Sequence, residues 1–163
     1  MFKTDKKCVI ITLITNITKE YKNIMNLDEL KSMINDDLKV DRTSLSSESA
    51  HNPLLYTKYV HIRSEIDLEI KKAELEKKRV TTQRWLYYSG KGSGKVCPIE
   101  YSQSELKRVL ESDDEILKVE RKLILLELQK ELADEAVKAF HMRGFSINGI
   151  MKWEMFTQGN ISN

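Results

Sequence analysis

The sequence has few of the residues that cross-link compact non-helical folds or form their turns. Its 163 residues include only two cysteines, two prolines and six glycines. Cys8 and Cys97 lack the spacing of a metal site and make a disulfide framework implausible, so we expect reduced thiols in a cytosolic protein. The three histidines are scattered along the chain, whereas a zinc site needs three or four converging ligands. We therefore expect neither a bound metal ion nor another cofactor.

Catalytic motifs are also missing. The segment GKGSGK at residues 90–95 looks like a phosphate-binding loop, but it departs from that motif at two positions. The motif needs glycine where the chain has Ser89, and Ser or Thr after the lysine where the chain has Val96. No Ser/His/Asp or Cys/His set accompanies it. The sequence therefore predicts a protein that binds its partners and is not an enzyme.

The N-terminal segment has no hydrophobic run long enough to span a bilayer. Its short β-branched run, residues 8–17, is far too brief to cross a membrane and precedes no small-residue cleavage site. We interpret residues 1–24 as an N-terminal extension, from an upstream start codon or as an optional arm. A helical domain is expected at residues 25–159, followed by a tail at residues 160–163. We expect a cytoplasmic protein that makes no contact with a membrane.

Hydrophobic periodicity predicts an all-α fold. Apolar residues make up 40% of the chain and charged residues 32%, which suits long amphipathic helices. A first short helix is expected after Met25, because apolar residues recur there at helical spacing as far as Leu38. Asn52 and Pro53 suit the start of a long helix that runs to about Tyr88, although that helix could begin earlier and bend at the proline. A helix of this length, about 54 Å, implies a partner helix.

The glycine-rich loop at residues 90–95 ends the first long helix. Its glycines can let backbone amides approach phosphates, or the loop can simply reverse the chain. A short helix can follow at residues 104–110. Ser112, with Glu115 three positions later, predicts the capped start of a second long helix.

Apolar residues cover more than half of the circumference of this second long helix. One apolar face can meet the first long helix, and the other then requires a second subunit. Gly144 is expected to end the helix and Ser146 to cap a short C-terminal helix, which either packs on its own bundle or holds subunits together. The sequence thus predicts two long antiparallel helices joined by the Gly-rich loop, with short N- and C-terminal helices. The residues expected between subunits are Ile124, Leu128, Leu132, Ile147, Ile150, Trp153 and Phe156.

Positive charge is concentrated at residues 71–95. This segment has eight Lys/Arg against two acids, a net charge of +6, whereas the whole chain carries only +2. Basic groups that follow a phosphate backbone, with aromatic faces on which bases stack, are what unspecific single-strand binding needs. The alternative is a solvated face on a long helix, its aromatic residues closing the helix end. The candidate DNA-binding residues are Lys71, Lys72, Lys77, Lys78, Arg79, Arg84, Trp85, Tyr87, Tyr88, Lys91 and Lys95.

Five segments of the chain resemble, in order, the UvsY recombination mediators of tailed phages. The likeness covers roughly residues 25–159, and YYSGxGxG followed by SELKxVL is its distinctive part. The family pattern begins at the position of Met25, which supports reading the preceding residues as an addition. The five segments are MNLDELKSMINDDLKVDRTSL from Met25, NPLLYTKYVHIRSEI from Asn52, RWLYYSGKGSG from Arg84, YSQSELKRVLESDDEILKV from Tyr101, and RGF from Arg143.

The resemblance implies an accessory protein of homologous recombination and repair. Such proteins bind single-stranded DNA, the phage single-strand-binding protein and a RecA-like recombinase, and help the recombinase nucleate a filament on coated DNA. The family is helical and forms ring-like homo-oligomers of about six or seven subunits through the C-terminal region. DNA contact in the family centres on basic residues just ahead of YYSG. Arg84 matches one of them, whereas a lysine expected two residues earlier is Thr82, and Lys77, Lys78 and Arg79 can compensate.

A second class of function also fits the composition. A helical scaffold or assembly chaperone that binds only protein would carry the same lysines to stay soluble. The two functions differ in their response to salt, because affinity from phosphate contacts falls steeply as salt rises.

Overall fold

The structure, a computed structural model, describes residues 26–159. Within this range the chain is helical and contains no strand, so the predicted all-α class is confirmed. The elements are α2 (Leu27–Asp37), the 3-10 helix η2 (Arg42–Ser44), α3 (Leu45–Tyr88), α4 (Gln103–Glu111) and α5 (Asp114–Thr157). The expectations for residues 1–24 and for the tail at residues 160–163 lie outside the described range.

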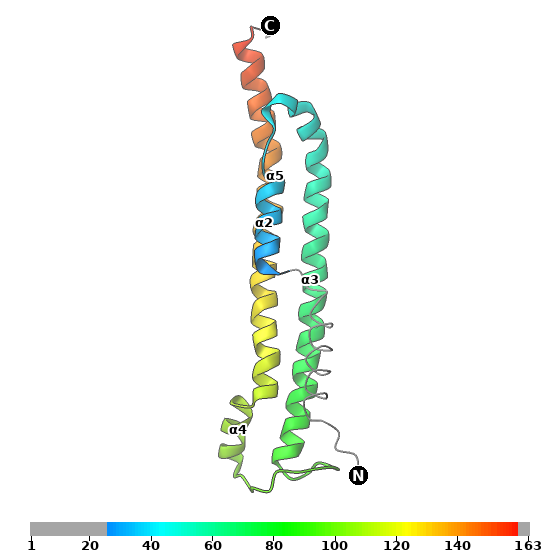
Figure 1. Cartoon of the computed structure of the whole chain (residues 1–163), viewed down its shortest axis with the longest axis vertical. Coiled ribbons are helices and arrows are strands. Elements are labelled where there is room, and N and C mark those ends of the chain that lie inside the picture. The colour runs from blue at the N-terminus through cyan, green and yellow to red at the C-terminus, as the bar shows by residue number, and fades with distance from the viewer. Residues whose placement is uncertain (1–25, 160–163) are drawn as a thin grey trace, which may run out of the picture.

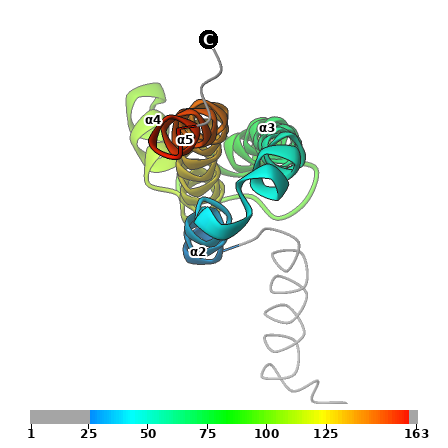
Figure 2. The same ribbon diagram turned by 90° about the horizontal axis from the view of Figure 1, so that it is seen from above.

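Two long helices dominate the molecule. Both α3 and α5 have 44 residues, which corresponds to about 66 Å each. They run antiparallel along each other, as expected from the sequence (Figure 1). Seen along the bundle, α2 packs against the α3–α5 pair and α4 lies on the outer side of α5 (Figure 2).

The main core lies where α2, α3 and α5 meet. Leu30 of α2, Tyr59 of α3 and Phe140 of α5 are almost completely buried there, and the rings of Tyr59 and Phe140 stack with centroids 4.6 Å apart. Further along the bundle, Ala73 of α3 and Leu126 of α5 are also fully buried. The small alanine side chain leaves room for close approach of the two long helices at this level.

Ion pairs between α3 and α5 flank the apolar seam. Lys130 contacts Asp67 at 2.7 Å, and Lys77 contacts Glu120 at 2.9 Å. These pairs are partly exposed, so each adds little stability by itself. Their regular placement along the seam nevertheless favours one register of the two helices over others.

The first long helix begins at Leu45, not at Pro53, which lies inside α3. The Asn52 side chain does not cap the helix. It is buried, and its amide donates a hydrogen bond of 3.0 Å to the backbone carbonyl of Phe140. A contact with the other long helix therefore determines the conformation here, in place of the local Asn-Pro signal.

The second long helix continues through Gly144, so the predicted C-terminal helix is not a separate element. Gly144 does not have the positive φ of a helix C-cap, and Ser146 donates back to the Met142 carbonyl at 3.2 Å instead of capping a new helix. A Cβ at position 144 would lie only 3.2 Å from the side-chain nitrogen of Asn52. Glycine is thus placed here because α3 approaches closely, although it costs helix propensity.

The start of α5 also differs from the prediction. Asp113, and not Ser112, is the N-cap, and its carboxylate accepts hydrogen bonds from the backbone of Glu115 and Ile116. Ser112 instead ends α4. The short helix expected near residues 104–110 is present as α4, so the segment after α3 leads into α4 and not directly into α5.

A buried arginine fastens the other end of the bundle. Arg143 of α5 donates to the Lys39 carbonyl at 2.8 Å and to the Asn52 side-chain oxygen at 3.1 Å, and it forms an ion pair with Glu48. The Arg143 guanidinium lowers the pKa of the Glu48 carboxyl below its usual range. One side chain thereby joins the linker after α2, the first turns of α3 and the upper part of α5.

Candidate nucleic-acid interface

One exposed part of the predicted basic cluster is a stripe along α3. Lys71, Lys78 and Trp85 are seven residues apart, so two helical turns bring each onto the same face. All three are exposed, and we call them the α3 stripe. Arg79 is exposed beside it. Among residues 26–159, neither lysine of the stripe nor Arg79 forms an ion pair, although Lys71 is near enough to Asp67 to help lower the pKa of that carboxyl.

Two other predicted contacts are engaged within the chain. Lys72 forms an ion pair of 2.7 Å with Glu69 on its own helix, and Lys77 forms the pair with Glu120 of α5. Thr82, where the resemblance leads us to expect a lysine, lies on the exposed surface and donates to the Lys78 carbonyl at 2.9 Å. Fewer basic side chains of α3 are therefore outside ion pairs than the sequence cluster suggests.

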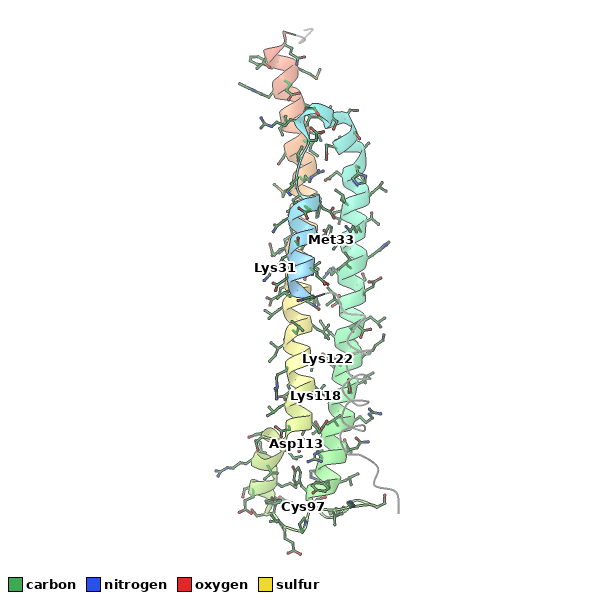
Figure 3. The ribbon with its side chains drawn as sticks, in the orientation of Figure 1. Lys31, Met33, Cys97, Asp113, Lys118 and Lys122 are labelled. Carbon is green, nitrogen blue, oxygen red and sulfur yellow. The ribbon has the colours of Figure 1, made fainter. Side chains whose placement is uncertain are left out.

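Arg84 belongs to a hydrogen-bonded cluster with Tyr88 and Asp113. Its Nε donates to the Asp113 carboxylate at 2.7 Å, and an Nη donates to the Tyr88 hydroxyl at 2.9 Å. The Tyr88 hydroxyl in turn donates to Asp113 at 2.9 Å. Figure 3 labels Asp113 at the start of α5, beside the end of α3. This cluster joins the two long helices at the end of the bundle opposite Arg143.

The electrostatics of the cluster favour its charged form. Burial raises the pKa of Asp113, but hydrogen bonds from Tyr88 and Arg84 outweigh that effect, and the net pKa lies below its ordinary value. Burial and the hydrogen bond to Asp113 raise the pKa of the Tyr88 hydroxyl. The Arg84 guanidinium also lies 4.8 Å from the centre of the Tyr87 ring. Because an arginine has five N–H donors, the half-buried Arg84 retains donors for a phosphate while it holds Asp113.

The glycine-rich segment folds back on the end of α3. The amide of Gly92 donates to the Leu86 carbonyl at 3.1 Å, and the amide of Cys97 donates to the Tyr87 carbonyl at 3.0 Å. These two amides are therefore occupied, whereas Lys91 and Lys95 are exposed. Figure 3 places Cys97 in this connection at the lower end of the bundle.

Further basic side chains were not among the sequence candidates. Lys107 and Arg108 of α4 are exposed, and so are Lys118 and Arg121 of α5. Lys118 and Lys122 lie along α5 beyond Asp113 (Figure 3). Each set is too short to stand out as a charge run, but the recurrence of basic residues at positions 118, 121 and 122 is a helical spacing that could have revealed the second set.

The residues expected between subunits fall into three groups. Ile124, Leu128, Trp153 and Phe156 are exposed, and Trp153 retains 65% of its accessible surface. Leu132 and Ile150 are half-buried, and Ile147 is completely buried within its own chain. An exposed apolar surface thus continues along the outer side of α5, but Ile147 belongs to the core.

Across residues 26–159, no group of three or more His, Cys, Asp and Glu side chains is placed to hold a metal ion. No helix in the described part of the chain is both long and apolar enough to cross a membrane.

The chain is similar to known proteins in sequence and in fold. A family model described as recombination, repair and ssDNA binding protein UvsY matches residues 33–160. Over 136 residues the chain is 34% identical to the recombination protein uvsY of Enterobacteria phage T4, covering 83% of this chain and 99% of that protein.

The fold is similar to crystal structures of the bacteriophage T4 recombination mediator protein UvsY. In lattice type II the TM-score is 0.74 at 33% identity, with 83% of this chain and 99% of that chain covered. In lattice type IV the TM-score is again 0.74 at 33% identity, with coverage of 81% and 99%.

Proposed function

Because the chain belongs to the UvsY family of recombination, repair and single-stranded DNA-binding proteins, we propose that it helps load a RecA-like recombinase onto single-stranded DNA. In this proposal the DNA is coated by a single-strand-binding protein, which the recombinase must displace. The chain acts by binding and carries out no reaction. As a phage protein, it acts in the cytoplasm of the host cell.

The α3 stripe is the observation that carries the DNA-binding part of the proposal. Lys71 and Lys78 offer two charges on one face, and neither is in an ion pair with any of residues 26–159, while Trp85 adds an exposed aromatic ring in line with them. A positive track beside an aromatic platform suits a strand whose bases are not paired. A solvated helix face would have no need of an exposed tryptophan.

Assembly would multiply a weak contact. We propose a ring-like homo-oligomer of about six or seven subunits, held together in part by exposed Ile124, Leu128, Trp153 and Phe156. One α3 stripe gives modest affinity, but a strand held by one subunit meets the next at a high effective concentration. Wrapping the strand around several subunits would distort its complex with the single-strand-binding protein and lower the barrier to exchange.

Fluorescence anisotropy of a labelled single-stranded oligonucleotide tests this function. We expect binding that prefers the single strand to a duplex of equal length and that weakens as salt rises. Replacing Lys71 and Lys78 with glutamine should lower both the affinity and the salt dependence, by about 0.7 in the slope of log K against log salt for each phosphate that is no longer neutralised. Lys138→Gln is the matched control, because Lys138 is also exposed but paired with Glu135 far along α5.

The competing function is a scaffold that binds only protein. It predicts no salt-dependent affinity for the oligonucleotide even at low ionic strength. An exchange assay then tests the mediator role, since a true mediator must speed the replacement of the single-strand-binding protein by recombinase. Unchanged exchange rates in the presence of DNA binding would refute the loading mechanism but keep the DNA-binding function.

A further inference from the structure

A surface pocket opens where the end of α3 meets α4. It has a volume of about 410 Å³, within the ~300–1,000 Å³ range of pockets that hold small organic groups. Its lining combines aromatic, apolar, cationic and uncharged polar side chains: Trp85 and Tyr101, Leu106 and Leu110, Lys91 and Lys107, and Ser89 and Gln103.

The aromatic lining is held in place by the cluster at the start of α5. The Tyr101 ring packs edge-on against Tyr88, with centroids 6.0 Å apart. Tyr88 is fixed in turn by its hydrogen bond to buried Asp113. The contacts that join the two long helices therefore also support the pocket. They hold the wall that contains Tyr101 in place, so this wall is not a free loop.

Lys91 occupies the face of Trp85 that a ligand would use. Its ammonium lies 5.2 Å from the centre of the indole ring, a weak contact for a solvated cation. A flat aromatic ligand would gain more from the indole face than Lys91 does. Displaced from the ring, the Lys91 ammonium would lie beside the ligand at the pocket rim, where it can pair with an anion.

We propose that this pocket receives one base of the bound single strand, stacked on Trp85, while Lys91 and Lys107 contact the flanking phosphates. The inference rests on the proposed single-strand binding and extends it from the α3 stripe onto α4. Three observations favour a nucleotide as the occupant. Two aromatic rings line the pocket, two exposed lysines line it as well, and Trp85 is the last residue of the α3 stripe, so a strand that follows Lys71 and Lys78 arrives at the pocket.

The proposal separates base contacts from phosphate contacts in one experiment. Oligothymidylate and an abasic strand of equal length carry the same phosphates, and only the first can stack. We expect Trp85→Ala to weaken oligothymidylate binding about tenfold, in the range found for one stacked base, and to leave abasic binding and the salt slope unchanged. Trp85→Phe keeps a ring at this position and should restore most of the affinity.

Tryptophan fluorescence gives an independent readout. The chain has two tryptophans, so the difference in emission between the unaltered protein and Trp85→Phe reports on Trp85, and oligothymidylate should quench this difference signal while the abasic strand should not. If Trp85→Ala weakens both strands equally, or if both strands leave the emission unchanged, the pocket does not take a base, although the α3 stripe still binds DNA. If the unaltered protein binds neither strand, the proposed function fails together with the pocket.

Discussion

Replacing Asp113 with alanine is expected to lower the free energy of unfolding by about 3 kcal/mol. The carboxylate side chain is only 2% exposed and has two structural roles. It caps α5, and removing such a cap costs about 1 kcal/mol. It also accepts hydrogen bonds from Arg84 and Tyr88, and a bond to a charged group contributes about 1.5–3 kcal/mol. We take about 2 kcal/mol for this second part, because the Arg84 side chain is 30% exposed and water can replace some of the interaction.

Asparagine at position 113 separates the two roles. Asparagine caps helices as well as aspartate does, so Asp113→Asn should keep the cap and remove only the charge, with a cost of about 2 kcal/mol. Asp114→Asn is the matched control. It removes the same charge one residue later from an exposed position that has no ion pair among the described residues, and it should cost no more than about 0.5 kcal/mol through the helix dipole.

Urea denaturation followed by circular dichroism at fixed protein concentration measures these differences. The concentration must be constant, because assembly would stabilise every variant by mass action. The reasoning is refuted if Asp113→Asn and Asp114→Asn destabilise the protein equally, since the buried ion pair would then contribute nothing beyond a surface charge. An Arg84→Ala and Asp113→Ala double-mutant cycle should show coupling above about 0.5 kcal/mol, as expected for residues in contact.

Three other predictions follow from features at both ends of the bundle. In the folded protein the pKa of Asp113 lies below its ordinary value of 3.8. The charged carboxylate therefore stabilises the fold above pH 3.8, and this stabilisation is lost as the pH falls further. The stability difference between the unaltered protein and Asp113→Asn should shrink on titration from about pH 6 to about pH 3. Arg143→Met should lower the free energy of unfolding, measured in urea, by about 3 kcal/mol, because it leaves Glu48 and buried carbonyl groups without their donor. A loss below about 1 kcal/mol would contradict the role of Arg143 in joining the helices. Serine at both Trp153 and Phe156 should shift light-scattering masses toward smaller assemblies without changing the urea midpoint of the isolated subunit, and an unchanged mass would place the contact elsewhere.

Local periodicity was sufficient to predict the fold class and the two long helices. Apolar residues such as Tyr59, Leu126 and Phe140 recur at helical spacing, and all three are buried in the seam between α3 and α5. An amphipathic helix depends mainly on its own pattern, so this information is present in neighbouring residues. Lys71 and Lys78 of the α3 stripe were among the sequence candidates, but charge and spacing alone did not separate them from Lys72 and Lys77, which are paired within the chain.

The helix limits and part of the candidate site depend on distant contacts. Asn52 and Gly144 look like a start and a stop, yet the close approach of the two long helices places both inside regular helix. Arg84 looks like a free cation, yet its partner Asp113 lies 29 residues further along the chain. Single-sequence patterns do not specify which distant side chain neutralises which charge, and for that reason the arginine's structural role was missed.

Under the proposed assembly, the offset between the two long helices would couple folding to protein concentration. Since Leu45 begins α3 near the level of Arg143, the last turns of α5 extend past the rest of the bundle, as Figure 1 shows. An isolated helical segment as short as the one beyond Ile147 is marginal in water. In the proposed assembly, a neighbouring subunit that covers Trp153 and Phe156 would stabilise this segment as a helix. Dilution, which separates the subunits, should therefore unwind these turns before the subunit core is affected. Helix content measured against concentration would thus report on association directly, without a label.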